Sequence, residues 1–250
     1  AAYYALNLDA DADNFARVWI ASARILDAGN QIEEHRLFSK LIEEVVEEFV
    51  PLGIRIFNLS VADLAKKWNL DGKRTQPRTS WTARTIDRLS REHDIIFVVS
   101  TGNIPENQIR DYLQDDIPYP AYLCDEEARI LDPGQAGLAI SVGSIAAGTL
   151  VASTPDTAVA LNYEPSPFTR SGPGIKRETK PDLVEVGGNL VRDQESHWVR
   201  SNSATSVVTA SHQLSPAASH KYGTSFAAPR VAHKLAVLME ELQQLGLGHV

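Results

Sequence analysis

Cysteine is almost absent from this 250-residue sequence, and the absence limits both its chemistry and its compartment. With the single residue Cys124 the chain cannot form an internal disulfide. This is compatible with a reducing compartment and favours the cytoplasm without proving it. No metal-ligand spacing surrounds Cys124, so we expect a buried structural thiol there.

Long apolar runs and excess positive charge are also missing. No apolar stretch approaches the roughly 18 residues of a membrane helix, so we expect no membrane partner. The net charge of −8 argues against a nucleic-acid partner, because phosphate binding requires a basic surface. We find no internal repeat and no low-complexity segment.

The sequence also lacks an initiator methionine and a basic-then-apolar leader, opening instead Ala-Ala-Tyr-Tyr. Residues 1–6 are typical of the tail of a helix, and we therefore expect the chain to begin inside a larger domain. The hydrophobic fraction of 43% and charged fraction of 22% are ordinary for a globular protein. We predict one domain over residues 1–250, incomplete at its N-terminus.

Hydrophobic periodicity predicts strands that alternate with helices. Strands are predicted at 17–26, 54–60, 95–100 and 138–145, with helices at about 30–50, 80–92 and 225–243. The first helix opens with a capping pair, Asn30 and Glu33, and ends at Pro51 and Gly53. In the last helix Pro229 is expected in the first turn. Residues 146–220 are interpreted as loops with a few peripheral strands, such as 206–211.

This order of elements predicts right-handed crossovers and a mainly parallel, doubly wound sheet. We therefore predict a three-layer α/β sandwich.

The segment GTSFAAPRVA (223–232) places Ser225 before a helix, among small residues. Unpaired N–H groups at a helix N-terminus suit the oxyanion that forms in acyl transfer. Ser before a helix is more commonly a simple cap. Taken alone, this segment leaves both interpretations open.

A second segment, VVSTGN (98–103), ends a strand in Gly102 and Asn103. Ligands of open α/β sheets bind beyond the carboxyl ends of the strands, where the amide of Asn103 can donate to an oxyanion. The usual explanation of such a Gly-Asn pair is a turn.

Together these two segments resemble the subtilisin family of serine peptidases, and further segments fit in order. They are ARILD (23–27), IFNLSVA (56–62), AISVGSI (139–145), SPFTRSGPG (166–174) and KPDLVEVGG (180–188). The resemblance spans about residues 1–245, and the Gly-Thr-Ser-x-Ala-x-Pro motif is highly specific.

The resemblance implies that Ser225 is the nucleophile and that Asn103 helps to hold the oxyanion. It also implies an extended polypeptide substrate between Ser60-Val61-Ala62 and Ser100-Thr101-Gly102. The catalytic Asp and His of the family precede the region covered here, and no His-Gly-Thr occurs in this chain. We therefore expect both upstream of residue 1, and residues 1–250 alone to be inactive.

The chain departs from the family pattern at several positions. Arg230 and His233 stand where the family usually has His and Gly, and Ala62 replaces a Gly of the substrate-binding strand. KPDLVEVGG lacks the usual Pro before Gly. The stretch between Asn103 and Ser225 is longer than in compact relatives, with insertions expected around 104–136 and 187–220.

None of the seven histidines is expected to be the general base. His35 is placed on a helix surface, His93 before a buried strand, and His233 within the last helix; the others lie in loop-rich or terminal sequence, at His197, His212, His220 and His249.

We expect no cofactor and no metal. Asp9, Asp11 and Asp13 alternate as in a calcium loop, but Asn14 and Ile20 break the EF-hand pattern. A solvated acidic turn fits this cluster better.

Two function classes are compatible with the sequence. The first is a serine endopeptidase with an acyl-enzyme on Ser225, and the second is a non-catalytic subtilisin-like module that binds peptide or a partner protein. Ser225 and Asn103 together favour the enzyme. An α/β-hydrolase esterase is excluded because Ser225 lies in G-T-S-F-A and not in a G-x-S-x-G elbow.

Overall fold

The computed structural model describes residues 18–27, 29, 31–32, 35–67, 79–148, 150, 155–174, 177–193, 198–211, 215–216 and 218–247. Several predicted features lie outside the described residues. They are the helix tail at 1–6, the Asp9–Asp13 cluster, the capping pair Asn30 and Glu33, and three histidines, His197, His212 and His249.

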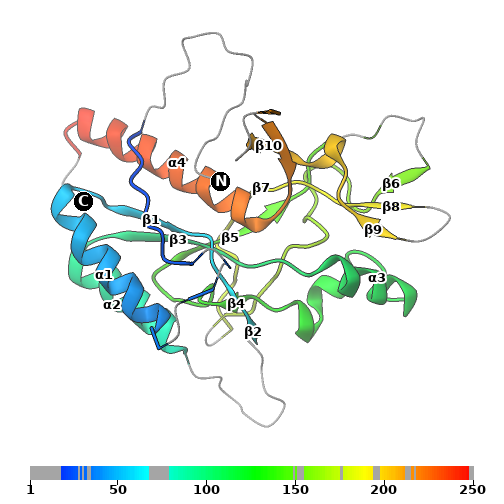
Figure 1. Cartoon of the computed structure of the whole chain (residues 1–250), viewed down its shortest axis with the longest axis horizontal. Helices are drawn as coiled ribbons and strands as arrows, with labels where there is room; N and C mark the ends of the chain where they lie inside the picture. The colour runs from blue at the N-terminus through cyan, green and yellow to red at the C-terminus, as the bar shows by residue number, and fades with distance from the viewer. Residues whose placement is uncertain are drawn as a thin grey trace.

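The centre of the fold is a four-stranded sheet whose neighbouring strands all run parallel (Figure 1). Its order is β1-β3-β5-β7, with bounds Ile56–Leu59, Ile96–Ser100, Ile140–Ile145 and Leu183–Val186. Strand β3 lies inside this sheet and is almost wholly buried, as its continuous apolar run predicts.

Helices cover both faces of this sheet. Helices α1 (Phe38–Phe49) and α2 (Trp81–His93) pack on one face, where Phe97 and Val99 of β3 join their apolar residues. Helix α4 (Thr224–Gln244) packs on the other face against Val98 of β3. Alternate residues of one strand therefore enter two different cores, as its period of two requires. The predicted three-layer α/β fold with a parallel sheet is confirmed.

The ends of α1 and α2 follow from local sequence. Helix α1 continues into the 3₁₀ turn η1 (Val50–Leu52) and stops at Gly53, which adopts a φ of 87°. Helix α2 begins at the cap Ser80, whose hydroxyl oxygen accepts from Ala83 N at 3.0 Å. The predicted stop at Pro51 and Gly53 is confirmed.

Smaller elements surround the central sheet. Short antiparallel pairs join β2 to β4 and β10 to β11, and a three-stranded sheet has the order β6-β8-β9. No helix within the described residues combines the length and apolar character needed to cross a membrane. The bounds are β2 Asp63–Lys67, α3 Glu106–Gln114, η2 Ala121–Cys124, η3 Glu126–Ala128, β4 Leu131–Asp132, β6 Asp156–Ala158, β8 Val191–Asp193, β9 Val199–Arg200, η5 Ser203–Thr205, β10 Val207–Ala210 and β11 Ala218–Lys221.

Two strand predictions were wrong. The described residues 18–27 form no strand, and Trp19 among them is 99% exposed. Alternation alone does not make a strand, because a strand also needs a hydrogen-bonded neighbour. Conversely, β7 belongs to the central sheet although its region was interpreted as loops and peripheral strands. Its four residues are too few to show a period, and Glu185 interrupts their apolar character.

Three single-residue predictions were also wrong. Pro229 lies beyond the first turn of α4, inside the helix. Cys124 is exposed, because the short turn η2 directs Tyr122 and Leu123 into the core. His35 precedes α1 in a left-handed turn with a φ of 74°, and is not on the helix.

A buried polar contact joins β5 to the segment that leads into β7. The Lys180 side chain is 3% exposed, and its Nζ donates to Asp182 Oδ2 at 2.7 Å and to Ala139 O at 3.1 Å. The same carboxylate accepts from the backbone N and the hydroxyl of Ser141, both at 2.7 Å. Burial raises the pKa of Asp182, but these hydrogen bonds outweigh it and lower the pKa overall.

We expect Asp182→Asn to lower the free energy of unfolding at pH 7 by about 1–3 kcal/mol, because the Lys180 ammonium loses its carboxylate partner. A carboxylate whose folded pKa is lowered stabilises the fold above its unfolded pKa and stops doing so as pH falls through the folded value. The difference between the two proteins should therefore shrink below about pH 4. Urea unfolding at several pH values measures it.

The matched control is Asp111→Asn, whose carboxylate is 58% exposed and contacts Arg110 at 3.3 Å. Equal losses in the two variants, or a difference that does not change with pH, would contradict this account of Asp182.

Candidate active site

Ser225 lies in the first turn of α4 and is not its cap. The cap position belongs to Gly223, and no side chain makes a capping bond there. The Ser225 hydroxyl instead donates to the backbone oxygen of Ser60 at 3.5 Å. The structure therefore contradicts the simple helix-cap interpretation and leaves this hydroxyl half-buried beside the segment that follows β1.

Asn103 lies just past the carboxyl end of β3, and its side chain crosses to the start of α4. Its Oδ1 accepts from Thr224 N at 2.9 Å and from Thr224 Oγ1 at 3.1 Å. An ordinary turn residue would bond within its own loop. Because Oδ1 is held by Thr224, the two N–H donors of Nδ2 are left for another acceptor near the N-terminus of α4.

Gly223 makes this approach possible. It adopts a φ of 142°, and a Cβ at this position would stand 2.9 Å from Asn103 Nδ2. Any side chain here would push the carboxamide away from Thr224. The Gly of the Gly-Thr-Ser segment is therefore required by the amide that lies against it.

Arg170 holds the backbone of Asn103 from the other side, and sequence reasoning missed it. The residue is 2% exposed, and its Nε donates to Asn103 O at 3.0 Å. Its Nη1 donates to Glu127 O at 2.7 Å and to Arg129 O at 3.1 Å. Burial lowers the pKa of Arg170 to about 10. An arginine between Thr169 and Ser171 in a loop carries no sequence signal of burial.

Pro229 leaves the backbone oxygen of Ser225 without its normal helical donor. A residue four positions along would donate its N–H to this oxygen, but proline has none. The Ser60 hydroxyl lies in this place and donates to Ser225 O at 3.4 Å. Ser60 and Ser225 thus bond one another in both directions, which ties the start of α4 to the end of β1.

The two segments expected to bracket a substrate have different environments. Ser60, Val61 and Ala62 are half-buried, whereas Ser100 and Thr101 are 1% and 0% exposed. Strand β4 joins the two sides, since Leu131 N donates to Thr101 O at 3.1 Å and β4 pairs with β2 directly after Ala62. The Leu131 side chain lies against Gly102.

The titratable groups around Ser225 are few. Within the described part of the chain no histidine accepts from the Ser225 hydroxyl, whose hydrogen bond goes to Ser60. His233 lies two turns further along α4, and His220 lies in β11. The described residues also contain no cluster of three or more His, Cys, Asp or Glu that could hold a metal.

This arrangement brings a hydroxyl, a side-chain amide and the N-terminus of a long helix to one place. Thr224 N and Phe226 N are bonded, to Asn103 Oδ1 and Gly223 O, so the Ser225 N–H and the oriented amide are the groups that can together stabilise negative charge on an oxygen bound next to Ser225.

Comparison with known proteins supports one family. Residues 17–247 match the profile described as the subtilase family. A protein of Sinorhizobium fredii, "Uncharacterized protein y4bN", is 37% identical over 199 residues, which are 76% of this chain and 44% of that protein. The chain therefore spans less than half of this relative.

One solved structure with a TM-score above 0.5 shares the fold. A lanthipeptide protease has a TM-score of 0.51 and 18% identity, over 88% of this chain and 55% of its own. Patellamide maturation protease PatA has a TM-score of 0.49 and 17% identity, over 86% and 54%.

We expect Gly223→Ala to displace the Asn103 carboxamide and to destabilise the protein more than Gly53→Ala does. Both glycines have positive φ, 142° and 87°, but nothing lies within 4 Å of a Cβ at Gly53. Gly53→Ala should cost only about 1–2 kcal/mol of backbone strain. Urea unfolding gives the two losses, and the side-chain ¹⁵N–¹H signals of Asn103 report its position. Unmoved Asn103 signals in Gly223→Ala would show that Gly223 does not set the amide.

Proposed function

The chain belongs to the subtilase family of peptidases, and on this premise we propose that it is a serine endopeptidase acting through an acyl-enzyme on Ser225. The observation that carries the proposal is the pair of hydrogen bonds between Asn103 Oδ1 and Thr224. They set the amide donors beside Ser225, a role that a helix-capping serine and a turn asparagine would not need.

In the proposed reaction the Ser225 oxygen attacks the carbonyl carbon of a peptide bond while a histidine takes its proton. Asn103 Nδ2 and the backbone N–H of Ser225 donate to the oxyanion that forms. The carbon–nitrogen bond then breaks, and the histidine returns the proton to the amine. Water hydrolyses the ester by the same route.

The base and its orienting carboxylate belong to the proposal as well. In the resting structure the Ser225 hydroxyl is bonded to Ser60 O, and within the described residues it has no histidine partner. We propose that the Asp and His of the family pattern precede residue 1 in the complete protein. In the complete protein the Ser225 hydroxyl would then donate to this histidine and no longer to Ser60 O.

The proposed substrate is an extended polypeptide between Ser60–Ala62 and Ser100–Gly102. The Thr101 backbone is already bonded, its N to Val142 O and its O to Leu131 N, both at 3.1 Å, so we assign backbone pairing with the substrate to residues 60–62. Such pairing tolerates many sequences, so side-chain preference depends on the space between the two segments. Leu131 is fully buried and its side chain lies against Gly102, and in the other segment Ala62 stands where the family pattern has a glycine. Both favour a small side chain in this space.

A non-catalytic peptide-binding module is the alternative. Such a module would need the two bracketing segments but neither an oriented Asn103 amide nor the Ser225 hydroxyl. The buried Arg170 donates to Asn103 O as well as to Glu127 O and Arg129 O, and this hold on the Asn103 backbone favours the enzyme.

In the complete protein we expect Ser225→Ala to abolish peptide hydrolysis and labelling by a fluorophosphonate probe. Asn103→Ala should lower kcat by roughly 10²–10³-fold with a smaller effect on KM, because the oxyanion forms only during the reaction. Asn162→Ala is the matched control, since Asn162 is exposed and lies outside the site. Hydrolysis that persists unchanged in Ser225→Ala would defeat the mechanism.

Residues 1–250 expressed alone should hydrolyse a generic peptide substrate at a very small fraction of the complete protein's rate. Serine is a weak nucleophile unless a base removes its proton, although oxyanion stabilisation can leave a residual rate. Robust turnover that Ser225→Ala removes would mean that a histidine within residues 1–250 is the base, and the proposal of an upstream base would then be wrong.

A further inference from the structure

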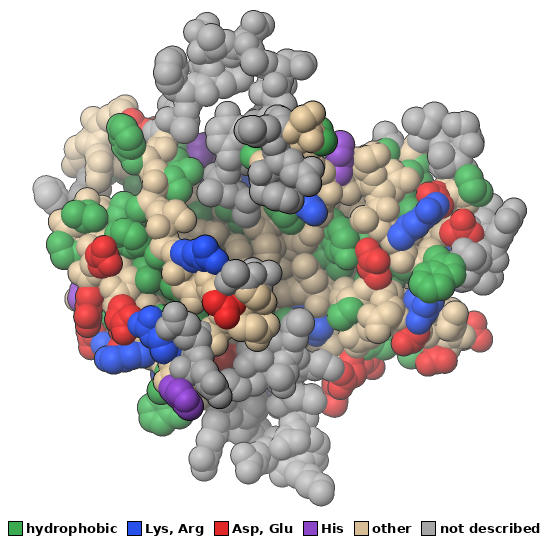
Figure 2. Space-filling model, viewed as in Figure 1, with side chains coloured by type: hydrophobic (Ala, Val, Ile, Leu, Met, Phe, Trp, Pro, Cys, Tyr) green, Lys and Arg blue, Asp and Glu red, His purple; other side chains and the backbone are tan. Residues whose placement is uncertain are grey.

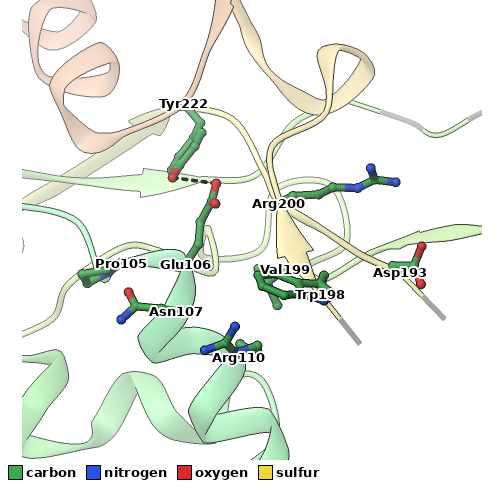
Figure 3. A pocket seen from close by; sticks show the side chains of 9 residues that line it. All are labelled: Pro105, Glu106, Asn107, Arg110, Asp193, Trp198, Val199, Arg200 and Tyr222. Atoms are coloured by element: carbon green, nitrogen blue, oxygen red, sulfur yellow. Dashed lines mark hydrogen bonds between the residues drawn. The ribbon is translucent and has the colours of Figure 1, made fainter. Parts of the chain in front are cut away.

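A cavity of about 760 Å³ lies next to the candidate active site, and the proposed mechanism does not use it (Figure 3). One wall is formed by α3, which contributes Glu106 and Arg110. The other walls are formed by the end of β8, by β9 with the adjacent Trp198, and by Tyr222. This volume is in the range of cavities that bind small molecules or short peptide segments.

The cavity is continuous in sequence with both site residues. Pro105 in its wall follows Asn103 by two positions, and Tyr222 directly precedes Gly223. The Tyr222 hydroxyl donates to Glu106 Oε1 at 3.0 Å (Figure 3). The Tyr222 ring packs on Phe168, with ring centroids 4.9 Å apart. The wall between the cavity and Ser225 is therefore held in place by specific contacts.

The position of the cavity relative to the proposed cleft indicates what it would receive. Residues 100–102, which bracket the acyl side, come before Asn103, whereas α3 begins after it. In the proposed binding mode the acyl side of the substrate occupies the space between Ser60–Ala62 and Ser100–Gly102. Its leaving side then lies beyond Asn103 and Ser225, and Pro105 and Tyr222 of the cavity wall are close to these two residues in sequence. This is the side on which the leaving amine of the substrate would lie.

Two acidic and two basic side chains line the cavity. The acidic ones are Glu106 and Asp193, and the basic ones are Arg110 and Arg200. Arg200 is already bonded to Asp156, at 2.8 and 3.0 Å, and Asp156 itself has a side chain that is 4% exposed. Figure 2 shows Lys or Arg and Asp or Glu side chains interspersed over the end of the molecule that carries α3, β8 and β9. A lining without an excess of either sign does not select an ionic ligand.

Trp198 provides an exposed aromatic surface in the wall of this cavity. It is 57% exposed although the adjacent Val199 is 3% exposed. The Arg110 guanidinium lies over the indole, 4.9 Å from the ring centroid, and this contact orients the ring. An exposed, oriented indole is a typical surface for an aromatic side chain.

We propose that this cavity binds the leaving-group side of the polypeptide substrate and prefers an uncharged segment with an aromatic side chain, which packs on Trp198. The inference rests on the proposed peptidase function. The walls from α3, β8 and β9 lie within 104–136 and 187–220, where the sequence predicts insertions relative to compact subtilases. The cavity is therefore a feature of this chain and its longer segments.

Peptide binding to the complete protein carrying Ser225→Ala tests the inference without turnover. The probes are one fluorescein-labelled acyl-side tetrapeptide and the same peptide extended by two residues containing Phe, Glu or Lys, all amidated at the C-terminus. Fluorescence anisotropy should show the tightest binding for the Phe extension. Trp198→Ala should weaken that binding roughly three- to tenfold, the worth of one aromatic pair, and leave the tetrapeptide unaffected.

Trp81→Ala is the matched control, because Trp81 is also exposed, at 78%, and also carries an arginine, Arg84, over its ring at 5.6 Å. It should leave binding of every peptide unchanged, and Trp198→Phe should retain most of the preference for Phe. Equal binding of the three extensions, no gain over the tetrapeptide, or a gain that survives Trp198→Ala would each overturn the inference.

Hydrolysis of the same labelled peptides by the protein with Ser225 intact, followed as release of the labelled tetrapeptide acid, separates the two proposals. Turnover without any effect of extension would refute the cavity assignment and leave the peptidase standing. A Trp198-dependent gain without any turnover would refute the peptidase and keep the cavity as a peptide-binding site.

Discussion

The contact on which the candidate site depends is the bond between the Asn103 carboxamide and Thr224, two residues separated by 121 positions. This bond fixes which edge of the amide faces the start of α4, and two neighbouring residues help to keep the amide in this position. Gly223 leaves room for the amide, and Arg170 holds the backbone oxygen of the same residue from behind. The parallel sheet contributes by ending β3 next to the N-terminus of α4. An amide with free rotation could not present its donors to one point, so the proposed mechanism requires this rigidity.

The carbonyl oxygen of Ser225 is also bonded by a residue from a distant part of the chain. Proline within a helix normally weakens it by removing one hydrogen bond. Here the vacated acceptor is taken by the Ser60 hydroxyl, so that the interruption in α4 becomes a link between the helix and the segment after β1. The residues around Ser225 are thereby held by contacts from outside their own helix.

Much of the fold could be predicted from the sequence because its central elements carry strong periodic patterns. The apolar face of α1 and the continuous apolar run of β3 indicated their type and their layer. Ser225 and Asn103 could be selected because their flanking motifs are specific. Elements that depend on distant partners could not be found in this way. Strand β7 is recognisable only through its pairing with β5, Arg170 only through the three carbonyl oxygens it bonds, and the exposure of Cys124 only through the turn that directs its neighbours inward.

The order of these elements along the chain has a consequence for biosynthesis. Helix α4 follows every strand of the central sheet, so during translation Thr224 leaves the ribosome long after Asn103. Until then the carboxamide has no Thr224 to bond, and the oxyanion donors of the proposed mechanism have no fixed direction. Under the proposed mechanism, a nascent protein could not cleave itself or its neighbours on the polysome before α4 has folded, because the oxyanion donors would not yet be fixed.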